Sequence, residues 1–555
     1  PIDKIFREAD AAFKSWAELN PEERTTQRLL EMLHFDFFAL LDSVTIARSR
    51  KHIEKYYYDA SLGKFPERLK PISHRPDLTD LDGVTFNQIF EYITSLNLDI
   101  YTPLKYVLPS RIEKYVDLSS ASGRSWANRE TGRNILMTIN LLKRLESSVY
   151  AFRLTAQHIY DLIDSTIDNI HSFEQGRGNA FEIDEIDSND LDAEDAETDY
   201  VGKKFKVSLE DIDYVSWLDK LEKDKAILNE LLTLVAPVIE DHDLKLKKLL
   251  EVLDNKISSP INDSNRKVLV FTAFADTAYY LYNALSDKLY ANYGVHSAVV
   301  TGAKNPSTTL ENVHADFNEI LTCFSPKSKN RDALFDKNPG EIDILIATDC
   351  ISEGQNLQDC DYLINYDIHW NPVRIIQRFG RIDRIGSHNN QIQLTNFWPN
   401  ISLDEYIKLK ARVEGRMKIV NITSTGSDNP IDQADNAELE YRKKQLEKIQ
   451  NEVVDLEEMD SGVSIMDLGL NEFHLDLQEL LKKYGDAEHL PKGIHAIAKR
   501  QNDTPSGVIF VLKNLNQGVN IDKQNRLHPF YLVYIAEDGH VEINHLHPKE
   551  LLDKL

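Results

Sequence analysis

Four arginines stand close together in one short segment, with two glycines between and after them: Arg374, Arg378, Arg381 and Arg384, with Gly380 and Gly386. Crowded guanidinium groups repel one another unless anions or carboxylates lie among them, and Asp383 could serve one of the four. Arg381 and Arg384 are three residues apart, so on a helix they would share a face and could grip a phosphoryl group together. Gly380 would let that face approach the ligand closely. The segment therefore predicts a polyphosphate site, and the alternative is a solvated basic helix end.

The elements before this segment would position it. The apolar run 344–347 ends at the polar pair Thr348 and Asp349, and 362–366 is a second apolar run. Such short continuous runs are typical of strands buried in a parallel sheet. Farther upstream, residues 267–272 are expected to form a strand that enters a polar turn, and 299–302 the next strand. The alternation of strands and helices predicts an α/β fold, a parallel sheet with flanking helices.

Three segments resemble motifs of superfamily-two helicases, in the form found in Swi/Snf-type ATPases. Residues 377–386, QRFGRIDRIG, resemble motif VI; residues 347–357 resemble motif V; and residues 267–272 are similar to motif IV. The pair Ile382 and Asp383 is similar to the bacterial helicase-related subgroup rather than to eukaryotic nucleosome remodellers. The resemblance implies that the chain carries the C-terminal RecA-like lobe of an ATP-dependent helicase or translocase.

The resemblance also implies roles for individual residues. Arg381 and Arg384 would be arginine fingers that neutralise charge on the transferring phosphoryl group, and Gln377 would couple nucleotide state to closure of the cleft. ATP would be bound beside three further residues: Gly354, Asn356 and Gly380. The backbone of the tracked nucleic-acid strand would be contacted by three hydroxyl-bearing residues: Thr272, Thr348 and Ser352.

A phosphate-binding first lobe is not recognisable in this sequence. Such a lobe needs a G-x-x-x-x-G-K-[ST] loop and an acidic pair that holds Mg²⁺. Gly63-Lys64 and Gly202-Lys203 are not followed by a hydroxyl residue, and the acidic run at 184–187 lies in a polar stretch. We therefore expect a fragment that binds neither ATP nor Mg²⁺ alone and is inactive without the missing N-terminal RecA-like lobe. The alternative is a non-catalytic regulatory or protein-interaction module with a lobe-two fold.

The charge of the chain is strongly negative, at −26. This is unfavourable for a nucleic-acid binder, which needs cations for phosphate contacts, but the run 181–200 contains many carboxylates and neither Lys nor Arg. That run is either a disordered linker or an ordered segment that imitates DNA. The basic stretch 111–153 is either a solvated helical face or a flank that faces DNA. We expect double-stranded DNA as the partner, with DNA-processing or transcription proteins as further candidates.

The remaining sequence suggests how the chain is divided. Three cysteines without metal-ligand spacing indicate a reducing cytoplasm and no metal site, and no apolar run approaches the roughly 18 residues of a membrane span. Residues 64–80, with three prolines, are expected to be a loop, and Asp538-Gly539 is expected to form a hairpin turn between two short strands. We expect five regions: helices flanking the lobe junction at 1–175, an acidic linker at 176–205, helices leading into the lobe at 206–264, the RecA-like lobe at 265–425 and an α+β extension at 426–555.

Overall fold

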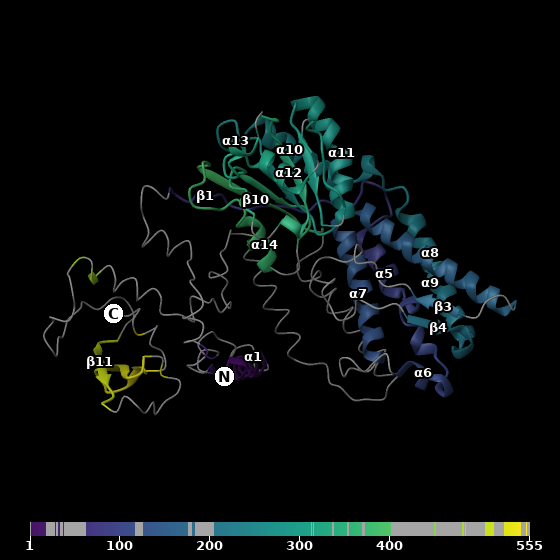
Figure 1. Cartoon of the computed structure of the whole chain (residues 1–555), viewed down its shortest axis with the longest axis horizontal. Helices are drawn as coiled ribbons and strands as arrows, with labels where there is room; N and C mark the ends of the chain where they lie inside the picture. The colour runs from purple at the N-terminus through teal and green to yellow at the C-terminus, as the bar shows by residue number, and fades with distance from the viewer. Residues whose placement is uncertain are drawn as a thin grey trace. The chain divides into compact units, whose positions relative to one another are not determined.

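The fold is given by a computed structural model (Figure 1). It describes residues 2–17, 63–116, 126–175, 180–183, 205–302, 304–311, 313–314, 316–335, 338–351, 355–368, 372–400, 505–515 and 527–545, with single residues 28, 32, 33, 37, 449, 450, 480, 481, 483, 525 and 551. The chain divides into two compact units. One comprises Pro1–Leu62, Asp432–Tyr441 and Val454–Leu555, and the other comprises Gly63–Ile431 and Arg442–Val453.

The larger unit is built on an eight-stranded sheet in the order β1-β10-β9-β5-β8-β6-β7, with β2 also paired to β10. Its five main strands run parallel: β5 (Val268–Phe271), β6 (Ser297–Val300), β8 (Ile344–Ala347), β9 (Tyr362–Asn365) and β10 (Gln391–Phe397). Among the described strands of this sheet, the short β7 (Ser307–Thr308) alone pairs antiparallel. The predicted α/β class, with a parallel sheet and flanking helices, is confirmed.

Helices cover both faces of this sheet. Val268 and Val270 belong to a core shared with α10 (Leu244–Ser258) and α11 (Ala275–Tyr293). Leu269 and Phe271 belong to a core shared with α12 (Phe317–Phe324) and the end of α14 (Pro372–Phe379). Successive strand residues point to opposite faces, so β5 and β8 are apolar throughout because both of their faces are buried. This is why continuous apolar runs identified them.

One edge of the sheet comes from residues that we expected to be a loop. The strands β1 (Glu67–Arg68) and β2 (Ile72–His74) both pair in parallel with β10. The loop expectation for 64–80 is therefore wrong in part. Pro71 lies between the two strands, and proline is compatible with an edge strand because the missing N–H is not needed there.

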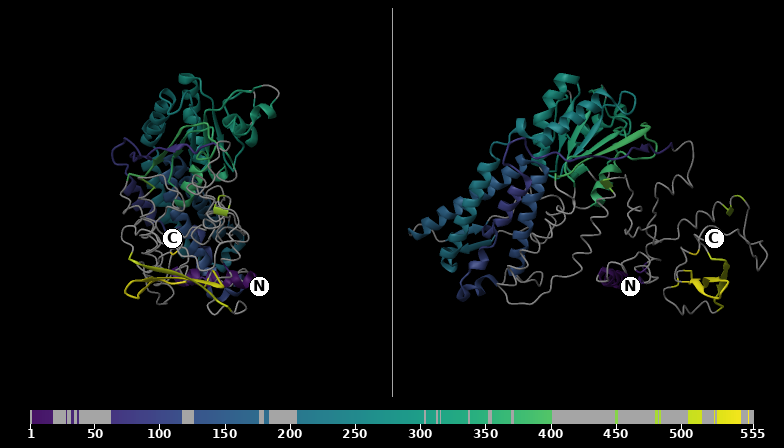
Figure 2. Two further views of the ribbon diagram at one scale, coloured as in Figure 1. Left: turned by 90° about the vertical axis from the view of Figure 1, so that its left-hand side faces the viewer. Right: turned by 180° about the vertical axis from the view of Figure 1, so that it is seen from behind.

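A helical bundle lies beside the sheet at the side of α11, as two views from opposite directions show (Figures 1 and 2). It contains α5 (Phe86–Ser95), α7 (Trp126–Ser147), α8 (Val149–Glu174) and α9 (Tyr214–Val235), with the single-turn α6 (Glu113–Val116) nearby in the chain. The helices share one apolar core that includes the fully buried Trp217. Ser148 separates α7 from α8 and caps α8, because its side chain accepts a hydrogen bond from the N–H of Ala151 at 3.0 Å.

The two ends of the expected acidic linker pair with each other. The strands β3 (Ala180–Ile183) and β4 (Phe205–Ser208) form an antiparallel two-stranded sheet. The expectation of a linker across all of 176–205 is therefore wrong at its ends, and residues 184–204 lie outside the described residues.

The smaller unit contains α1 (Ile2–Ala17) and an antiparallel sheet of β11 (Gly507–Lys513), β12 (Phe530–Ala536) and β13 (Val541–Ile543). The predicted hairpin turn is confirmed: Gly539 has a φ of +87° and donates its N–H to the carbonyl of Ala536 at 2.9 Å. Within the described part of the chain, no helix combines the length and apolarity that crossing a membrane would require.

Candidate functional site

The parallel strands bring two of the polar positions singled out above, Thr272 and Thr348, to one edge of the sheet, together with Asp367. Thr272 follows β5, Thr348 follows β8 and Asp367 lies two residues after β9. In open α/β sheets, ligands bind outside the carboxyl ends of the strands, where the order of the strands reverses. In this sheet that point lies between the neighbouring strands β5 and β9. The connection that leaves β5 through α11 runs to β6 on one side, and the connection that leaves β9 through α14 runs to β10 on the other side.

At this point, side chains from the sheet and from the end of α7 bind one another. Asp367 accepts hydrogen bonds from the hydroxyl of Thr272 at 2.5 Å and from the hydroxyl of Ser147 at 2.7 Å, and from the N–H of Ala273 at 2.8 Å. Thr272 has no exposed surface. The expected contact of Thr272 with a nucleic-acid strand does not fit this geometry, because its hydroxyl is buried in a link between the sheet and the end of α7.

Two buried cations reinforce the same junction. Lys245, at the start of α10, donates to the carbonyl of Ser147 at 3.0 Å and also to that of Glu146, and its ammonium lies 4.2 Å from the ring centroid of Tyr366. Burial lowers the pKa of Lys245 to about 8. Arg144, also fully buried, pairs with Asp276 of α11 at 3.1 Å. The bundle is therefore fastened to the sheet by buried polar contacts.

Arg378 has a structural role that its position in the arginine segment did not reveal. It is fully buried and binds Asp349 through two hydrogen bonds, Nε to Oδ1 at 2.8 Å and Nη2 to Oδ2 at 2.7 Å. Its Nη1 donates to the side chain of Asn365 at 3.1 Å. Arg378 therefore joins α14 to the ends of β8 and β9, and it is not available to a phosphate ligand.

Arg381 lies on a turn and Arg384 on irregular backbone just beyond it, since α14 ends at Phe379. The N–H of Leu357 donates to the carbonyl of Arg381 at 3.1 Å, and Nη1 of Arg381 lies 3.5 Å from the carbonyl oxygen of Gln355. Arg384 donates from Nε to the carbonyl of Gly380 at 2.9 Å. Both arginines are partly exposed. The segments that resemble motifs V and VI are therefore in direct contact, although the two arginines do not share a helical face.

Asp383 serves a different arginine from the four considered above. It pairs with Arg68 of β1, with Nη2 and Oδ2 2.6 Å apart. Close to this pair, the N–H of Gly386 donates to the carbonyl of Lys64 at 3.2 Å, and a Cβ at Gly63 would lie 2.8 Å from the Cα of Gly386. The backbone around Gly63, just before β1, and the backbone around Gly386, at the end of the arginine segment, are therefore in direct contact. This close approach explains why both positions are glycine.

The other predicted site residues lie around these contacts. The backbone N–H of Thr348 donates to the carbonyl of Val300 at 3.2 Å, and the residue is 8% exposed. The side chain of Asn356 accepts from the N–H of Gln358 at 3.3 Å, and Gln377 is partly exposed on α14. A Cβ on Gly380 would meet only ordinary contacts at 3.5 Å. Ser352 and Gly354 lie outside the described residues.

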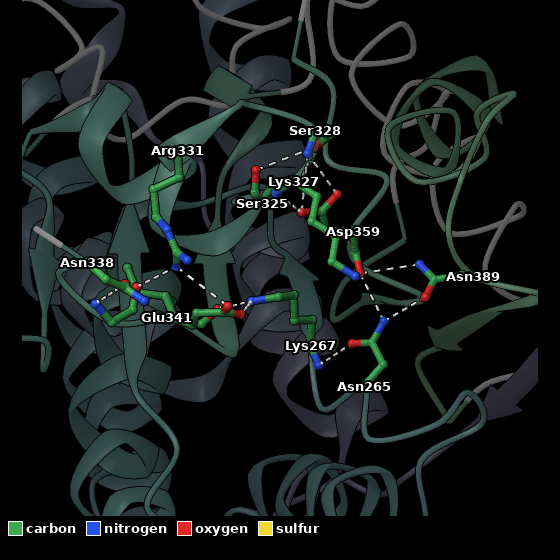
Figure 3. Close-up of polar contacts among 12 residues, drawn as sticks. Asn265, Lys267, Ser325, Lys327, Ser328, Arg331, Asn338, Glu341, Asp359 and Asn389 are labelled. Carbon is green, nitrogen blue, oxygen red and sulfur yellow. Dashed lines mark hydrogen bonds and ion pairs between the residues drawn. The ribbon is translucent and has the colours of Figure 1, made fainter. Parts of the chain in front are cut away.

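Sequence reasoning missed a loop that lies against this site. Lys329, between α12 and the short α13 (Arg331–Leu334), donates from Nζ to the side-chain oxygen of Gln355 at 2.6 Å. Its loop is held by Asp359, which accepts from the backbone N–H of Lys327 at 2.6 Å and of Ser328 at 3.1 Å (Figure 3). No recognisable motif marks this loop, so only the fold reveals it.

Comparison with known proteins agrees with this geometry. Residues 244–386 match the family model "Helicase conserved C-terminal domain". The chain is 41% identical over 81 residues to the "Uncharacterized ATP-dependent helicase YqhH" of Bacillus subtilis, a match that covers 15% of this chain and 14% of that protein. It is 28% identical over 152 residues to the "Putative ATP-dependent DNA helicase fml2" of Schizosaccharomyces pombe, covering 27% of this chain and 17% of that protein.

Among solved structures, the chain is similar to the helicase domain of Pyrococcus furiosus Hef, with a TM-score of 0.28 and 15% identity, over 64% of this chain and 59% of that one. The chain matches less than a fifth of the length of either curated relative. Residues 244–386 are thus similar in sequence to the helicase conserved C-terminal domain.

Proposed function

We propose that the larger unit is the second motor lobe of an ATP-dependent DNA translocase of the Swi/Snf type. In this proposal Arg381 and Arg384 reach the γ-phosphoryl group of an ATP molecule held by a first lobe, which supplies the phosphate loop and Mg²⁺. Arginines placed in this way stabilise the charge of the transition state. The chain alone would have negligible ATPase activity, because the phosphate loop and the metal ligands are supplied by the other lobe.

The observation that carries this proposal is the contact between Arg381 and residues 355–357. This contact supports a single site made from the motif V-like and motif VI-like segments. The two segments are separated in the sequence, and the fold brings them together. The internal role of Arg378 supports it further, because that residue and Asp349 together fix the arginine segment on the sheet. A cation can act on a transition state without reorganisation only when its segment is held in place.

The remaining roles follow from position. Gln377 would couple closure of the cleft to the nucleotide, while Gly354, Asn356 and Gly380 would lie beside the nucleotide. Thr348 and Ser352 would contact the phosphate backbone of the strand. Such contacts carry no sequence information, so we expect movement along duplex DNA without sequence preference.

The test compares two charge-removing substitutions in the protein that contains both lobes. Arg381→Ala should reduce DNA-stimulated ATPase turnover by about a thousandfold or more, the effect typical of arginine fingers. Arg374→Ala is the matched control: Arg374 is partly exposed on α14, and its substitution should change turnover by less than about threefold. The unmodified chain, assayed alone with duplex DNA, should show no turnover above background.

Two results would refute the proposal. The first is DNA-stimulated ATPase activity of the chain alone, since this would mean that no first lobe is required. The second is an Arg381→Ala protein that keeps the turnover and KM of the parent, which would leave the arginine segment without a catalytic role.

A further inference from the structure

A cation outside the helicase-like motifs lies against the arginine site. Lys329 belongs to the loop between α12 and α13, and its ammonium donates to the side-chain oxygen of Gln355 at 2.6 Å. Arg381 approaches the backbone oxygen of the same residue at 3.5 Å. One residue of the motif V-like segment is therefore contacted by two cations, one from the motif VI-like segment and one from a loop with no assigned role.

No described carboxylate lies close enough to Lys329 to form an ion pair with its ammonium. Its ammonium is partly buried, its one hydrogen-bond acceptor is a neutral amide, and it forms no ion pair with any residue that the structure describes. Burial lowers the pKa of its amine, which reflects the cost of removing a cation from water without a counter-charge. Natural proteins seldom bury a cation without a carboxylate. An anionic ligand would supply the negative charge that the described residues do not.

The loop holds Lys329 in place rather than leaving it as a mobile surface side chain. The carboxylate of Asp359 accepts from the backbone N–H groups of Lys327 and Ser328, and the N–H of Lys329 donates to the carbonyl of Ser325 at 3.0 Å. The hydroxyls of Ser325 and Ser328 are 2.7 Å apart. Figure 3 shows the contacts of Asp359 with Lys327 and Ser328, and the contact between Ser325 and Ser328.

Asp359 is itself anchored to the sheet. Its backbone carbonyl accepts from the side chain of Asn265, which precedes β5, at 2.9 Å and from that of Asn389, which precedes β10, at 3.3 Å (Figure 3). The loop that carries Lys329 is therefore fixed to the same rigid sheet as the arginine segment. Groups fixed in this way keep their geometry when a ligand arrives.

We propose that Lys329 is a third cation of the nucleotide site and binds the polyphosphate of ATP together with Arg381 and Arg384. This rests on the proposed function. The polyphosphate is favoured over the nucleic-acid backbone because Lys329 shares Gln355 with Arg381, the residue proposed to reach the γ-phosphoryl group. Lys329 would neutralise phosphate charge as a compact ammonium, whereas the arginines offer planar forks.

The experiment measures binding of inorganic tripolyphosphate to the full chain by calorimetry at low ionic strength, in four variants. Lys329→Gln should weaken binding about tenfold, as the loss of one charge-assisted contact predicts. Lys327→Gln is the matched control, because it makes the same charge change at an exposed position two residues away on the same loop, and it should change binding less than twofold. Lys329→Arg should keep binding within about threefold, and Arg381→Ala should weaken it.

A structural role for Lys329 predicts a different pattern. Removal of a partly buried cation without a carboxylate should leave the urea midpoint of Lys329→Gln unchanged or raise it, whereas a lysine that merely supports Gln355 should lower the midpoint when replaced and leave tripolyphosphate affinity intact. If Lys329→Gln does not fold, Lys329→Arg decides: a folded Lys329→Arg protein that has lost tripolyphosphate binding more than tenfold overturns the proposal.

The remaining outcomes separate this inference from the proposed function. Weaker binding by Arg381→Ala with unchanged binding by Lys329→Gln overturns the role of Lys329 and leaves the proposed function standing. No effect of either substitution, or no binding of tripolyphosphate at millimolar concentration by the parent chain, overturns the inference about Lys329. The proposed function is tested separately, by the turnover of Arg381→Ala in the protein that contains both lobes. A parallel titration with a 20-base-pair duplex should be unaffected by Lys329→Gln; weaker duplex binding with unchanged tripolyphosphate binding would assign Lys329 to nucleic acid and overturn the inference.

Discussion

Substitution of Arg378 by methionine tests whether one arginine of the segment is structural while its neighbours are not. Methionine keeps a long apolar side chain and removes the guanidinium, so Asp349 would lose its two hydrogen bonds to Arg378 at 2.7 and 2.8 Å. The side chain of Asp349 is only 10% exposed, so water replaces those bonds poorly. Removing one partner of a buried ion pair costs about 3–5 kcal/mol. We expect the free energy of unfolding of the larger unit to fall by that amount.

The assay is equilibrium urea unfolding followed by circular dichroism, with hydrogen exchange at the amides of β8 and β9 to assign the transition. Arg374→Met is the control, since Arg374 lies on the same helix and is partly exposed, and surface substitutions usually stay within about 0.5 kcal/mol. The double variant Arg378→Met with Asp349→Leu should recover most of the loss, because replacing a buried ion pair by apolar residues is often nearly neutral.

The reasoning fails if Arg378→Met lowers the free energy of unfolding by less than about 1 kcal/mol. It also fails if Arg374→Met costs as much as Arg378→Met, or if the double variant is no more stable than the single one. Any of these results would mean that the buried contacts of Arg378 do not hold α14 on the sheet.

Three further substitutions probe the junctions described above. Asp367→Ala should lower the unfolding free energy by about 2 kcal/mol or more, because the hydroxyl of Thr272 and the N–H of Ala273 lose an acceptor at about 1–3 kcal/mol each, whereas the hydroxyl of Ser147 keeps Thr277 at 2.8 Å; a urea midpoint equal to that of the parent would contradict this. Lys245→Met should remove a pH dependence: the folded pKa of about 8 lies below the unfolded value of about 10.4, so the parent should gain roughly 3 kcal/mol relative to the variant between about pH 8 and 10.5. A pH-independent difference in urea midpoints would contradict it. Gly63→Ala should speed hydrogen exchange at Gly386, because its Cβ would lie 2.8 Å from backbone, whereas Gly83→Ala, with a similar φ of +79° and open space around it, should not; equal effects would show that the close approach is unimportant.

The central strands could be predicted from the sequence because burial on both faces leaves a direct mark, a continuous apolar run such as Ile344–Ala347. The hairpin turn at Gly539 could also be predicted from the sequence, because its φ of +87° is a conformation that favours glycine. The two short edge strands were not predictable: two or three residues show no period, and their partner β10 lies far along the chain.

Part of the site was hidden for a related reason. The motif VI resemblance gives Arg381 a role and Arg378 none, but residue type and local spacing do not reveal that Arg378 is buried. Their difference lies in Asp349 and Asn365, which only the assembled sheet brings to Arg378. In the same way Lys329 stands in a polar stretch without a motif, and its contact with Gln355 depends on how two loops fold together.

The pairing of β1 with β10 also means that β1 is synthesised well before the strand with which it pairs. Glu67 bonds through its side chain to Gln391, 324 positions later, and a ribosome adding about 5–20 residues per second takes roughly 16–65 seconds to cover that distance. During this interval the early strands have no partner. Their length of two and three residues, the charges of Glu67 and Arg68 and the neighbouring Pro66 and Pro71 are features that discourage pairing with other nascent chains. The same features that hid these strands from sequence reasoning would protect the polypeptide while it waits for β10 to emerge.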